Sequence, residues 1–187
     1  MDPDLESLAD ECWRLLEAAP ADRDSPFRTP VLASGAAEAR TVVLRAADAA
    51  SRTLAVFTDV RSGKAGQLTS DPRACLVFYA QPAAVQLRAW GEATLHHGDG
   101  AARAHWSALP DFAKRPYHSM PGPGARRGKP GSGIPDIVDL EAGYSNFLVV
   151  AVTVTRLEWL RLVQGGNISA RFAWDGAGQL SAHWIVP

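Results

Sequence analysis

The stretch TDVRSGKAGQL, residues 58–68, gathers hydroxyl, guanidinium and amine groups directly after an apolar run. It lies between TLAVF and ACLVFYA, and this pattern predicts a strand that leads into a short helix. The free N–H groups and the positive dipole end of such a helix favour an anion. Thr58 and Ser62 can donate hydroxyl hydrogens, and Arg61 and Lys64 carry charge that pairs with phosphate. Taken alone, the stretch fits an anion site and a capped, solvent-facing turn equally well.

Other kinds of site find little support in the sequence. The G-x-x-x-x-G-K-[ST] spacing of an ATP-binding phosphate loop is absent, and so is the G-x-S-x-G of many hydrolases. The 5 histidines lack metal-ligand spacing, so no metal site is expected. The basic segment GARRGKPG carries no interleaved aromatic residues, which is more typical of a solvated loop than of a nucleic-acid site.

Size and composition indicate a folded protein. The chain has 187 residues, of which 47% are hydrophobic and 21% charged, and we expect one domain over residues 1–187. The formal net charge is -1, so no global field attracts nucleic acid or an anionic membrane. The apolar runs are strand-sized and the N-terminal stretch is acidic, which favours a cytoplasmic protein that does not cross a membrane.

Short runs rich in Val, Leu, Phe and Thr dominate residues 27–95. RTPVLAS, ARTVVLRAA, RTLAVFTD, RACLVFYA and AVQLRAWGEATL are separated by turn residues, and five consecutive strands favour an antiparallel meander. Later in the chain, FLVVAVTVTRLEWLRL indicates a long strand or a bent pair, and ARFAWD and LSAHWIVP indicate two more strands. Seven or eight strands with few helices predict a mainly β fold, an antiparallel barrel that is closed or nearly closed.

Two helices and one long loop complete the expected elements. Residues 4–18 place apolar side chains at helical spacing, which predicts an amphipathic N-terminal helix. GDGAARAHWSALP predicts a second helix, capped by Asp99 and stopped by Pro110. Residues 115–135 are rich in Pro and Gly, so we expect a loop without regular structure.

Several motifs occur in one order along the chain: RTVVLR, VFTDVRSGKAGQL, DPRACLVFY, VQLRAWGEA and, near the C-terminal end, QGGNISARF. This order resembles the pyridoxamine 5'-phosphate oxidase-like flavoproteins, the FMN-binding split-barrel family, and most closely the branch whose phosphate loop reads T-D-x-R-S-x-K. The similarity is close over residues 28–95 and looser over residues 147–187. It implies an antiparallel split barrel with flanking helices, and a homodimer with FMN at the subunit interface.

The resemblance also implies which residues bind FMN. Arg40 corresponds to an arginine that reaches the FMN phosphate, and Lys64 corresponds to the phosphate-binding lysine. The family's usual arginine just before this lysine is Gly63 here, and Arg61 with Ser62 is expected to supply the lost contact. The other implied FMN contacts are Thr41, Val42 and Val43 along the flavin, Phe57 and Thr58 beside the ribityl chain and ring, Gln86 from a neighbouring strand, and Arg171 over the ring.

Three further residues are implied on the substrate side. Arg45, Arg115 and Ser119 stand where the oxidases of the family hold the substrate phosphate, and RPYHS reproduces the R-P-x-x-S spacing of that clamp. The oxidases also carry an arginine and a histidine over the substrate ring, where this chain has Asn167 and Ser169. The resemblance therefore implies FMN binding without naming a catalytic residue.

Three functions remain open from the sequence. The first is an FMN-dependent oxidoreductase that acts on an unidentified small molecule. The second is a non-catalytic flavin-binding protein for storage or sensing, which the replacement of the arginine and histidine motivates. The third is a split barrel that uses haem or a deazaflavin. FMN itself needs a cationic, donor-rich pocket beside an apolar wall, and the strands around residues 40–64 offer both.

Overall fold

The computed structural model describes residues 3–35 and 38–187. The helices are α1 (Pro3–Ala18), α2 (Gly63–Ser70), α3 (Gly100–Ala108) and α4 (Asp111–Lys114), with 3-10 helices at Arg115–His118 and Leu140–Asn146. The strands are β1 (Val31–Ser34), β2 (Glu38–Thr41), β3 (Leu44–Asp48), β4 (Thr53–Asp59), β5 (Arg73–Ala80), β6 (Val85–His96), β7 (Phe147–Arg161), β8 (Ile168–Trp174) and β9 (Leu180–Ile185).

All the described strands join one antiparallel sheet in the order β2-β1-β5-β6-β7-β4-β3, with β8 on β7 and β9 on β8. Strand β7 is long enough to pair with β4 through its first half and with β8 through its second half. Strands β2 and β3 lie at opposite ends of this path, yet only Val42 and Val43 separate them in sequence. The sheet must therefore curl until its two edges meet, which makes it a split barrel.

Two amide groups at the junction of β2 and β3 form hydrogen bonds outside the strand ladder. Val42 N–H donates to the carbonyl of Pro30 at 2.9 Å, and Leu44 N–H donates to the carbonyl of Arg28 at 2.8 Å. The barrel is thus nearly closed. At β2 and β3, where a closed barrel has continuous hydrogen bonding between strands, this one has the link of Val42 and Val43.

The expected mainly β fold with flanking helices is confirmed, whereas the meander is wrong. The run ARTVVLRAA splits into β2 and β3, which pair with different strands, and β4 and β5 are not neighbours because α2 intervenes. The structure has nine described strands instead of seven or eight. Both expected helices are present, and Asp99 Oδ1 caps α3 by accepting from Ala102 N–H at 2.8 Å. The loop of residues 115–135 begins with a 3-10 helix that composition did not predict.

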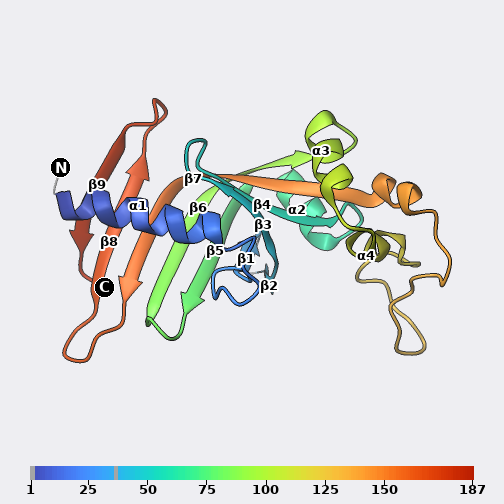
Figure 1. Cartoon of the computed structure of the whole chain (residues 1–187), viewed down its shortest axis with the longest axis horizontal. Helices are drawn as coiled ribbons and strands as arrows, with labels where there is room; N and C mark the ends of the chain where they lie inside the picture. Colours follow the sequence, from blue (N-terminus) through green and yellow to red (C-terminus); the bar gives the residue numbers. More distant parts are fainter. Residues whose placement is uncertain (1–2, 36–37) are drawn as a thin grey trace.

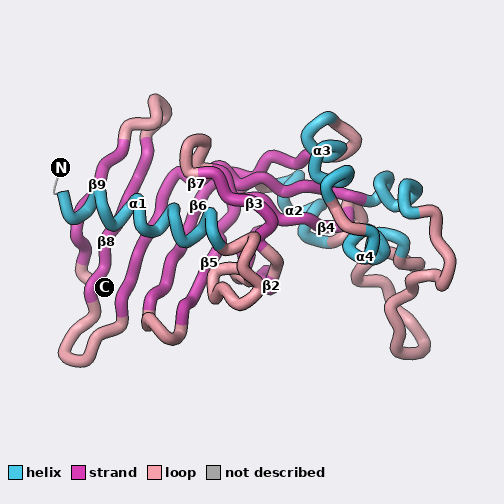
Figure 2. Tube along the Cα trace, in the orientation of Figure 1, coloured by secondary structure: helices cyan, strands magenta, loops and turns pink. Residues whose placement is uncertain are grey.

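One face of the sheet packs on α1. Leu5, Cys12 and Leu16 of this helix join the main core with inward side chains of the strands, among them Leu87 and Phe172. A second, smaller core around Trp106 and Phe147 lies under α3. Figure 1 and Figure 2 show α2, α3 and α4 gathered at one end of the molecule, while β8 and β9 form the other end.

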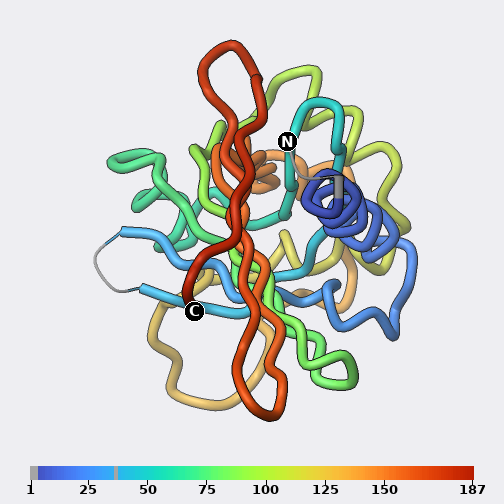
Figure 3. Tube along the Cα trace, turned by 90° about the vertical axis from the view of Figure 1, so that its left-hand side faces the viewer, coloured from blue at the N-terminus to red at the C-terminus, as the bar shows by residue number. Residues whose placement is uncertain are grey.

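The opposite face of the sheet, called the outer face below, carries Gln86, Arg88, Trp90, Glu158 and Arg171. Tyr79 on the neighbouring β5 is 46% exposed, so this face is accessible to solvent or to another molecule. Figure 3 looks along α1 and shows β8 and β9 as a long, twisted hairpin beside the rest of the sheet. Among residues 3–35 and 38–187, no helix has the length and apolarity needed to cross a membrane.

Gly91 lies where the register between β6 and β7 is irregular, and it has no room for a side chain. A Cβ atom at Gly91 would lie 2.0 Å from the carbonyl oxygen of Thr153. Gly91→Ala should therefore force β6 and β7 apart and lower the free energy of unfolding by at least about 2 kcal/mol. Urea denaturation measures the loss.

Gly100→Ala is the matched control, because a Cβ atom there meets nothing within 4 Å. This variant should unfold within about 0.5 kcal/mol of the unmodified protein. Equal midpoints for the two variants would contradict the close approach of β6 to β7 at Gly91.

Candidate functional site

Arg40 and Lys64 form a cation cluster where β2 comes close to α2. Arg40 Nη1 donates to Ser34 Oγ at 2.6 Å, and Arg40 Nη2 donates to Gln67 Oε1 at 2.9 Å. Lys64 Nζ donates to Thr58 Oγ1 at 2.9 Å. The structure therefore holds both cations through neutral partners on β1, β4 and α2.

The charge of this cluster is only partly balanced. Burial lowers the pKa of Lys64, and the nearby Arg40 guanidinium lowers it further, while Asp59 acts in the opposite direction. Among the described residues, Arg40 forms an ion pair only with the exposed Glu38, at 3.5 Å. An excess of positive charge thus remains beside α2, as an anion site requires.

The first turn of α2 adds further donors to the cluster. Ser62 is the N-cap residue, yet its side chain makes no capping hydrogen bond. Its Oγ instead lies 3.2 Å from Thr58 Oγ1, and both hydroxyl groups are buried. Ala65 N–H donates to the Ser62 carbonyl at 3.0 Å, whereas among the described residues the N–H groups of Gly63 and Lys64 have no partner. These two groups lie where the helix dipole is positive. The predicted site residues Arg40, Thr58, Ser62 and Lys64 come together here.

Arg61 lies in the same turn but its guanidinium group is engaged elsewhere. Nε and Nη2 donate to the two carboxylate oxygens of Asp59, at 2.9 and 2.6 Å. Asp59 is 6% exposed, and its hydrogen bonds raise the pKa of Arg61. The structure thus places Arg61 beside the cation cluster as the partner of a buried carboxylate.

The other residues implied beside the flavin, Thr41, Val42, Val43 and Phe57, lie at the end of β2, in the link to β3 and in β4. Val42 packs against the main core, and Phe57 packs against Phe147 with 5.1 Å between the ring centroids. Thr58 follows Phe57 directly in β4, so the two side chains lie on opposite faces of the strand.

Gln86 and Arg171 lie on the outer face, away from the cation cluster. Arg171 pairs with Glu158 across β7 and β8, and its Nε donates to Glu158 Oε1 at 2.7 Å. Arg88 of β6 forms an ion pair with the other oxygen of Glu158. Figure 1 shows β8 well separated from α2, so one chain does not bring Arg171 to Lys64.

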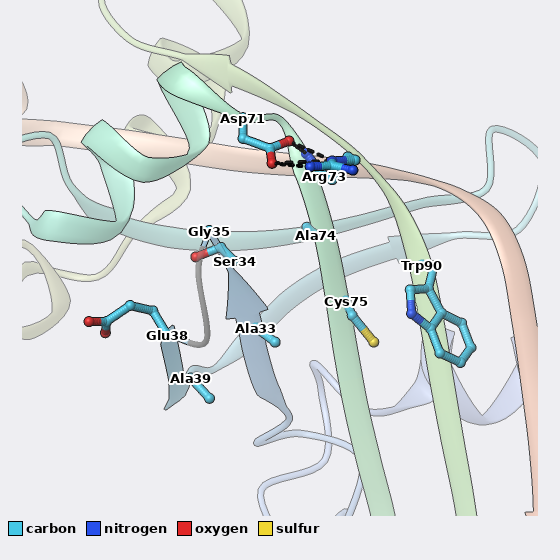
Figure 4. A pocket seen from close by; sticks show the side chains of 10 residues that line it. All are labelled: Ala33, Ser34, Gly35, Glu38, Ala39, Asp71, Arg73, Ala74, Cys75 and Trp90. Carbon is cyan, nitrogen blue, oxygen red and sulfur yellow. Dashed lines mark hydrogen bonds and ion pairs between the residues drawn. The ribbon is translucent and has the colours of Figure 1, made fainter.

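A shallow hollow of about 380 Å³ lies on the outer face, lined by residues of β1, β2, β5 and β6. Figure 4 shows Cys75 and Trp90 side by side on neighbouring strands, with the Asp71–Arg73 ion pair above them. Burial raises the pKa of the Cys75 thiol to about 11, so the thiol stays protonated at neutral pH. Ser34, which accepts from Arg40, also borders this hollow.

The three implied substrate residues do not converge on one another. Arg45 lies over the ring of Phe57, 6.0 Å from its centroid, and burial lowers the pKa of Arg45. Arg115 Nη2 donates to the carbonyl oxygens of Pro135 and Asp136, at 3.1 and 3.3 Å. Ser119 follows the 3-10 helix that Arg115 begins. Within the described part of the chain, no hydrogen bond joins these three side chains.

Sequence reasoning missed the residues that hold the named cations in place. Gln67 belongs to the quoted loop, but only the register of β1 against β2 shows that Ser34 and Gln67 meet at Arg40. His105 was also missed, and it packs on Phe57 with 5.0 Å between the ring centroids. No spacing in the sequence relates these residues, because each contact joins distant segments. Among the described residues, no His, Cys, Asp or Glu cluster could hold a metal ion.

Comparison with known proteins adds family information. Residues 13–97 match the pyridoxamine 5'-phosphate oxidase, FMN-binding domain family. None of the curated proteins compared with the chain matches it.

Solved structures share the fold at low sequence identity. A pyridoxamine 5'-phosphate oxidase-related, FMN binding protein from Nostoc punctiforme PCC 73102 is 24% identical, with a TM-score of 0.75 over 99% of this chain and 97% of that one. PhzG from Burkholderia lata 383, solved with tetrahydrophenazine-1-carboxylic acid, is 16% identical, with a TM-score of 0.71 over 100% and 95%. A general stress protein 26-related protein from Clostridium acetobutylicum is 12% identical, with a TM-score of 0.56 over 88% and 94%.

Because the charge of Lys64 is only partly balanced, we expect it to lower the melting temperature without a bound anion and to raise it when an anion binds. Its lowered pKa means that the folded state disfavours the charged amine, a cost that is present at pH 7 and falls as pH rises through the folded-state pKa. Lys64→Met should therefore melt at or above the temperature of the unmodified protein in a buffer without anions that bind. Inorganic phosphate at about 100 times its Kd should raise the melting temperature of the unmodified protein by roughly 5–10 °C.

Differential scanning fluorimetry with and without phosphate measures both effects. Lys129→Met is the control, because Lys129 is an exposed residue of the Pro/Gly-rich loop. Phosphate should stabilise this control like the unmodified protein and leave Lys64→Met nearly unchanged. An equal rise for all three proteins would remove Lys64 from the anion site.

Proposed function

Because residues 13–97 match the pyridoxamine 5'-phosphate oxidase, FMN-binding domain family and the chain has the split-barrel fold, we propose that it is a flavoprotein that binds FMN and uses it to oxidise or reduce a small molecule. The single observation that supports this proposal most strongly is the partly balanced pair of Arg40 and Lys64 beside the first turn of α2, which has no side-chain cap. A dianionic phosphate supplies the charge that this arrangement lacks.

The residues present fit the two chemical ends of FMN. Arg40 and Lys64 would pair with the phosphate, and the hydroxyl groups of Thr58 and Ser62 would donate to it. The link between β2 and β3 would line the flavin ring with Val42 and Val43, and Phe57 supports the strand beside it. Because Arg61 is bound to Asp59, we assign it no direct contact with the phosphate in this proposal.

We further propose a homodimer in which each FMN site uses both subunits. Gln86 and Arg171 share the outer face with the hollow of Figure 4, and β8 stands apart from α2 within one chain. The partner's Gln86 and the partner's Arg171 would then complete the site that Arg40 and Lys64 begin. Glu158 would hold this arginine in position, because it is buried and accepts from Arg171 Nε.

The bound flavin would supply hydride or electron transfer, and the protein would bind and orient the reactants. Arg45 is a partly buried cation over Phe57, which suits an acidic group of an aromatic substrate. Asn167 and Ser169 are engaged in the backbone structure: Asn167 Oδ1 accepts from Val163 N–H at 3.3 Å, and Ser169 Oγ donates to the Trp159 carbonyl at 2.8 Å. We therefore propose a substrate other than pyridoxamine phosphate.

The same two side chains support a second candidate, a flavin-binding protein for storage or sensing without turnover. Neither Asn167 nor Ser169 offers a group that could exchange a proton with a substrate at neutral pH. Mixing the FMN-loaded protein with NADH or NADPH in a stopped-flow spectrometer separates the candidates. Reduction followed by rapid reoxidation in air supports the oxidoreductase, and an unreactive flavin supports the second candidate.

Binding of FMN is testable directly. The purified protein should take up FMN, quench or shift its fluorescence, and melt at a higher temperature in its presence. Lys64→Met should weaken FMN binding by about 10- to 100-fold, since a charge-assisted contact contributes about 1.5–3 kcal/mol. Lys129→Met should bind FMN normally. A colourless protein whose melting is indifferent to FMN contradicts the proposal, and the absorption spectrum then shows whether haem or a deazaflavin is bound instead.

A shared site predicts complementation between two defective variants. Lys64→Met and Arg171→Ala should each bind FMN weakly as homodimers. After the two are mixed and their subunits exchange, half of the dimers carry one intact site, so about a quarter of all sites should bind FMN with native affinity. Titration of the mixture with FMN measures this fraction. No recovery after demonstrated subunit exchange would place both residues in the site of a single chain.

A further inference from the structure

We propose that Arg61 is a positioning residue that fastens residues 119–136, which include most of the Pro/Gly-rich loop, to the turn that carries Ser62 and Lys64. This role differs from phosphate binding, because Arg61 contacts a buried carboxylate on one side and the loop on the other.

On the side of the turn, Asp59 fixes the orientation of Arg61. The backbone N–H of Arg61 donates to Asp59 Oδ1 at 2.8 Å, while Nε and Nη2 occupy both carboxylate oxygens. A bidentate contact of this kind holds the plane of the guanidinium group and leaves Nη1 on its free edge. The same carboxylate contributes to the electrostatics of Lys64, whose pKa it raises against the effect of burial.

On the side of the loop, two residues lie against the Arg61 side chain. Arg61 Nη1 lies 3.6 Å from Met120 Sδ. A Cβ atom at Gly122 would lie 3.2 Å from Arg61 Nε and 3.3 Å from its Cβ and Cδ atoms. The backbone at Gly122 therefore packs directly on Arg61, at a distance that a larger residue would disturb.

The rest of the loop is tied to this contact through its base. Met120 N–H donates to the carbonyl of Gly133 at 2.9 Å, so the outgoing and returning segments are joined. Arg115 closes the base further by donating to the carbonyls of Pro135 and Asp136. A contact that holds Met120 and Gly122 thus restrains residues 120–136 as one unit, which lies at the end of the molecule near α4 (Figure 1).

Restraint of the loop and restraint of the turn at residues 58–64 are therefore coupled through Arg61. This consequence rests on the proposed binding of FMN: a phosphate at Lys64 would order residues 58–64, and Arg61 would pass that order to the loop. By reciprocity, a loop that stays closed would favour FMN by the same factor. The loop would then be held more tightly when the site is loaded than when it is empty.

The chain contains a matched control for this contact. Asp71 and Arg73 repeat the Asp-x-Arg arrangement, since the Arg73 N–H, Nε and Nη2 groups all donate to the Asp71 carboxylate. The Arg73 side chain is 82% exposed, and among the described residues its side-chain hydrogen bonds go to Asp71 alone. Replacing it removes the same local pairing without touching the loop.

Limited trypsin digestion tests the contact in the protein without FMN. Arg126 and Arg127 are exposed cleavage sites inside the loop. Arg61→Ala should speed cleavage there about tenfold, as expected when a contact of about 1.4 kcal/mol no longer opposes opening. Arg61→Lys keeps a positive charge near Asp59 but loses the fork, and it should also speed cleavage. Arg73→Ala should cleave at the rate of the unmodified protein. Unchanged cleavage in both Arg61 variants overturns the proposal.

Addition of FMN tests the coupling. FMN should slow cleavage of the unmodified protein and of Arg73→Ala, and it should protect the Arg61 variants much less, while Arg61→Lys retains FMN affinity within a few-fold. Suppose instead that both Arg61 variants lose affinity for FMN but not for riboflavin, and that cleavage stays slow. Arg61 would then be a phosphate ligand and the proposal would be wrong. An unmodified protein that binds no FMN contradicts the proposed function, whereas the digestion without FMN still decides the role of Arg61.

Discussion

The arrangement at α2 depends on holding two positive charges close together without neutralising them. Arg40 and Lys64 repel each other, and partial burial of Lys64 adds to the cost. The protein meets this cost with neutral partners, since Ser34 and Gln67 accept from Arg40 and Thr58 accepts from Lys64. A carboxylate in any of these positions would quench the charge that an anion needs.

The buried carboxylate nearest to the cluster is Asp59, and its pairing with Arg61 keeps the cluster cationic. Both oxygens of Asp59 accept from Arg61, so its negative charge is balanced within the turn. Without that pairing, Asp59 would offset Lys64, which follows five residues later in the same turn and helix. Asp59 and Arg61 thus form a balanced ion pair, whereas Arg40 and Lys64 keep most of their positive charge for an anion. This division explains why two basic residues so near in sequence, Arg61 and Lys64, serve different ends.

Much of this arrangement could be predicted from the sequence, and the reasons are local. The passage from β4 into α2, the cap at Asp99 and the helix of residues 3–18 each follow from short patterns. The split of ARTVVLRAA into β2 and β3 could not be predicted, because alternation continues through the link at Val42 and Val43. Only long-range pairing, of β2 with β1 and of β3 with β4, decides where each strand ends. The same limit hid the contact of Arg61 with Met120, which joins residues 59 positions apart.

The chemistry available near the proposed FMN site depends on which side chains already make hydrogen bonds within the fold. Asn167 and Ser169 serve the turn after β7 and the ladder of β8, so they have little freedom to act on a ligand. Arg171 is held by Glu158, which suits orientation better than proton transfer. We infer that substrate selectivity lies on the other side of the site, where Arg45 crosses Phe57 and where Arg61 restrains the loop. Pro and Gly residues give the loop its shape, and its Arg126, Arg127 and Lys129 would add positive charge to that of Arg45.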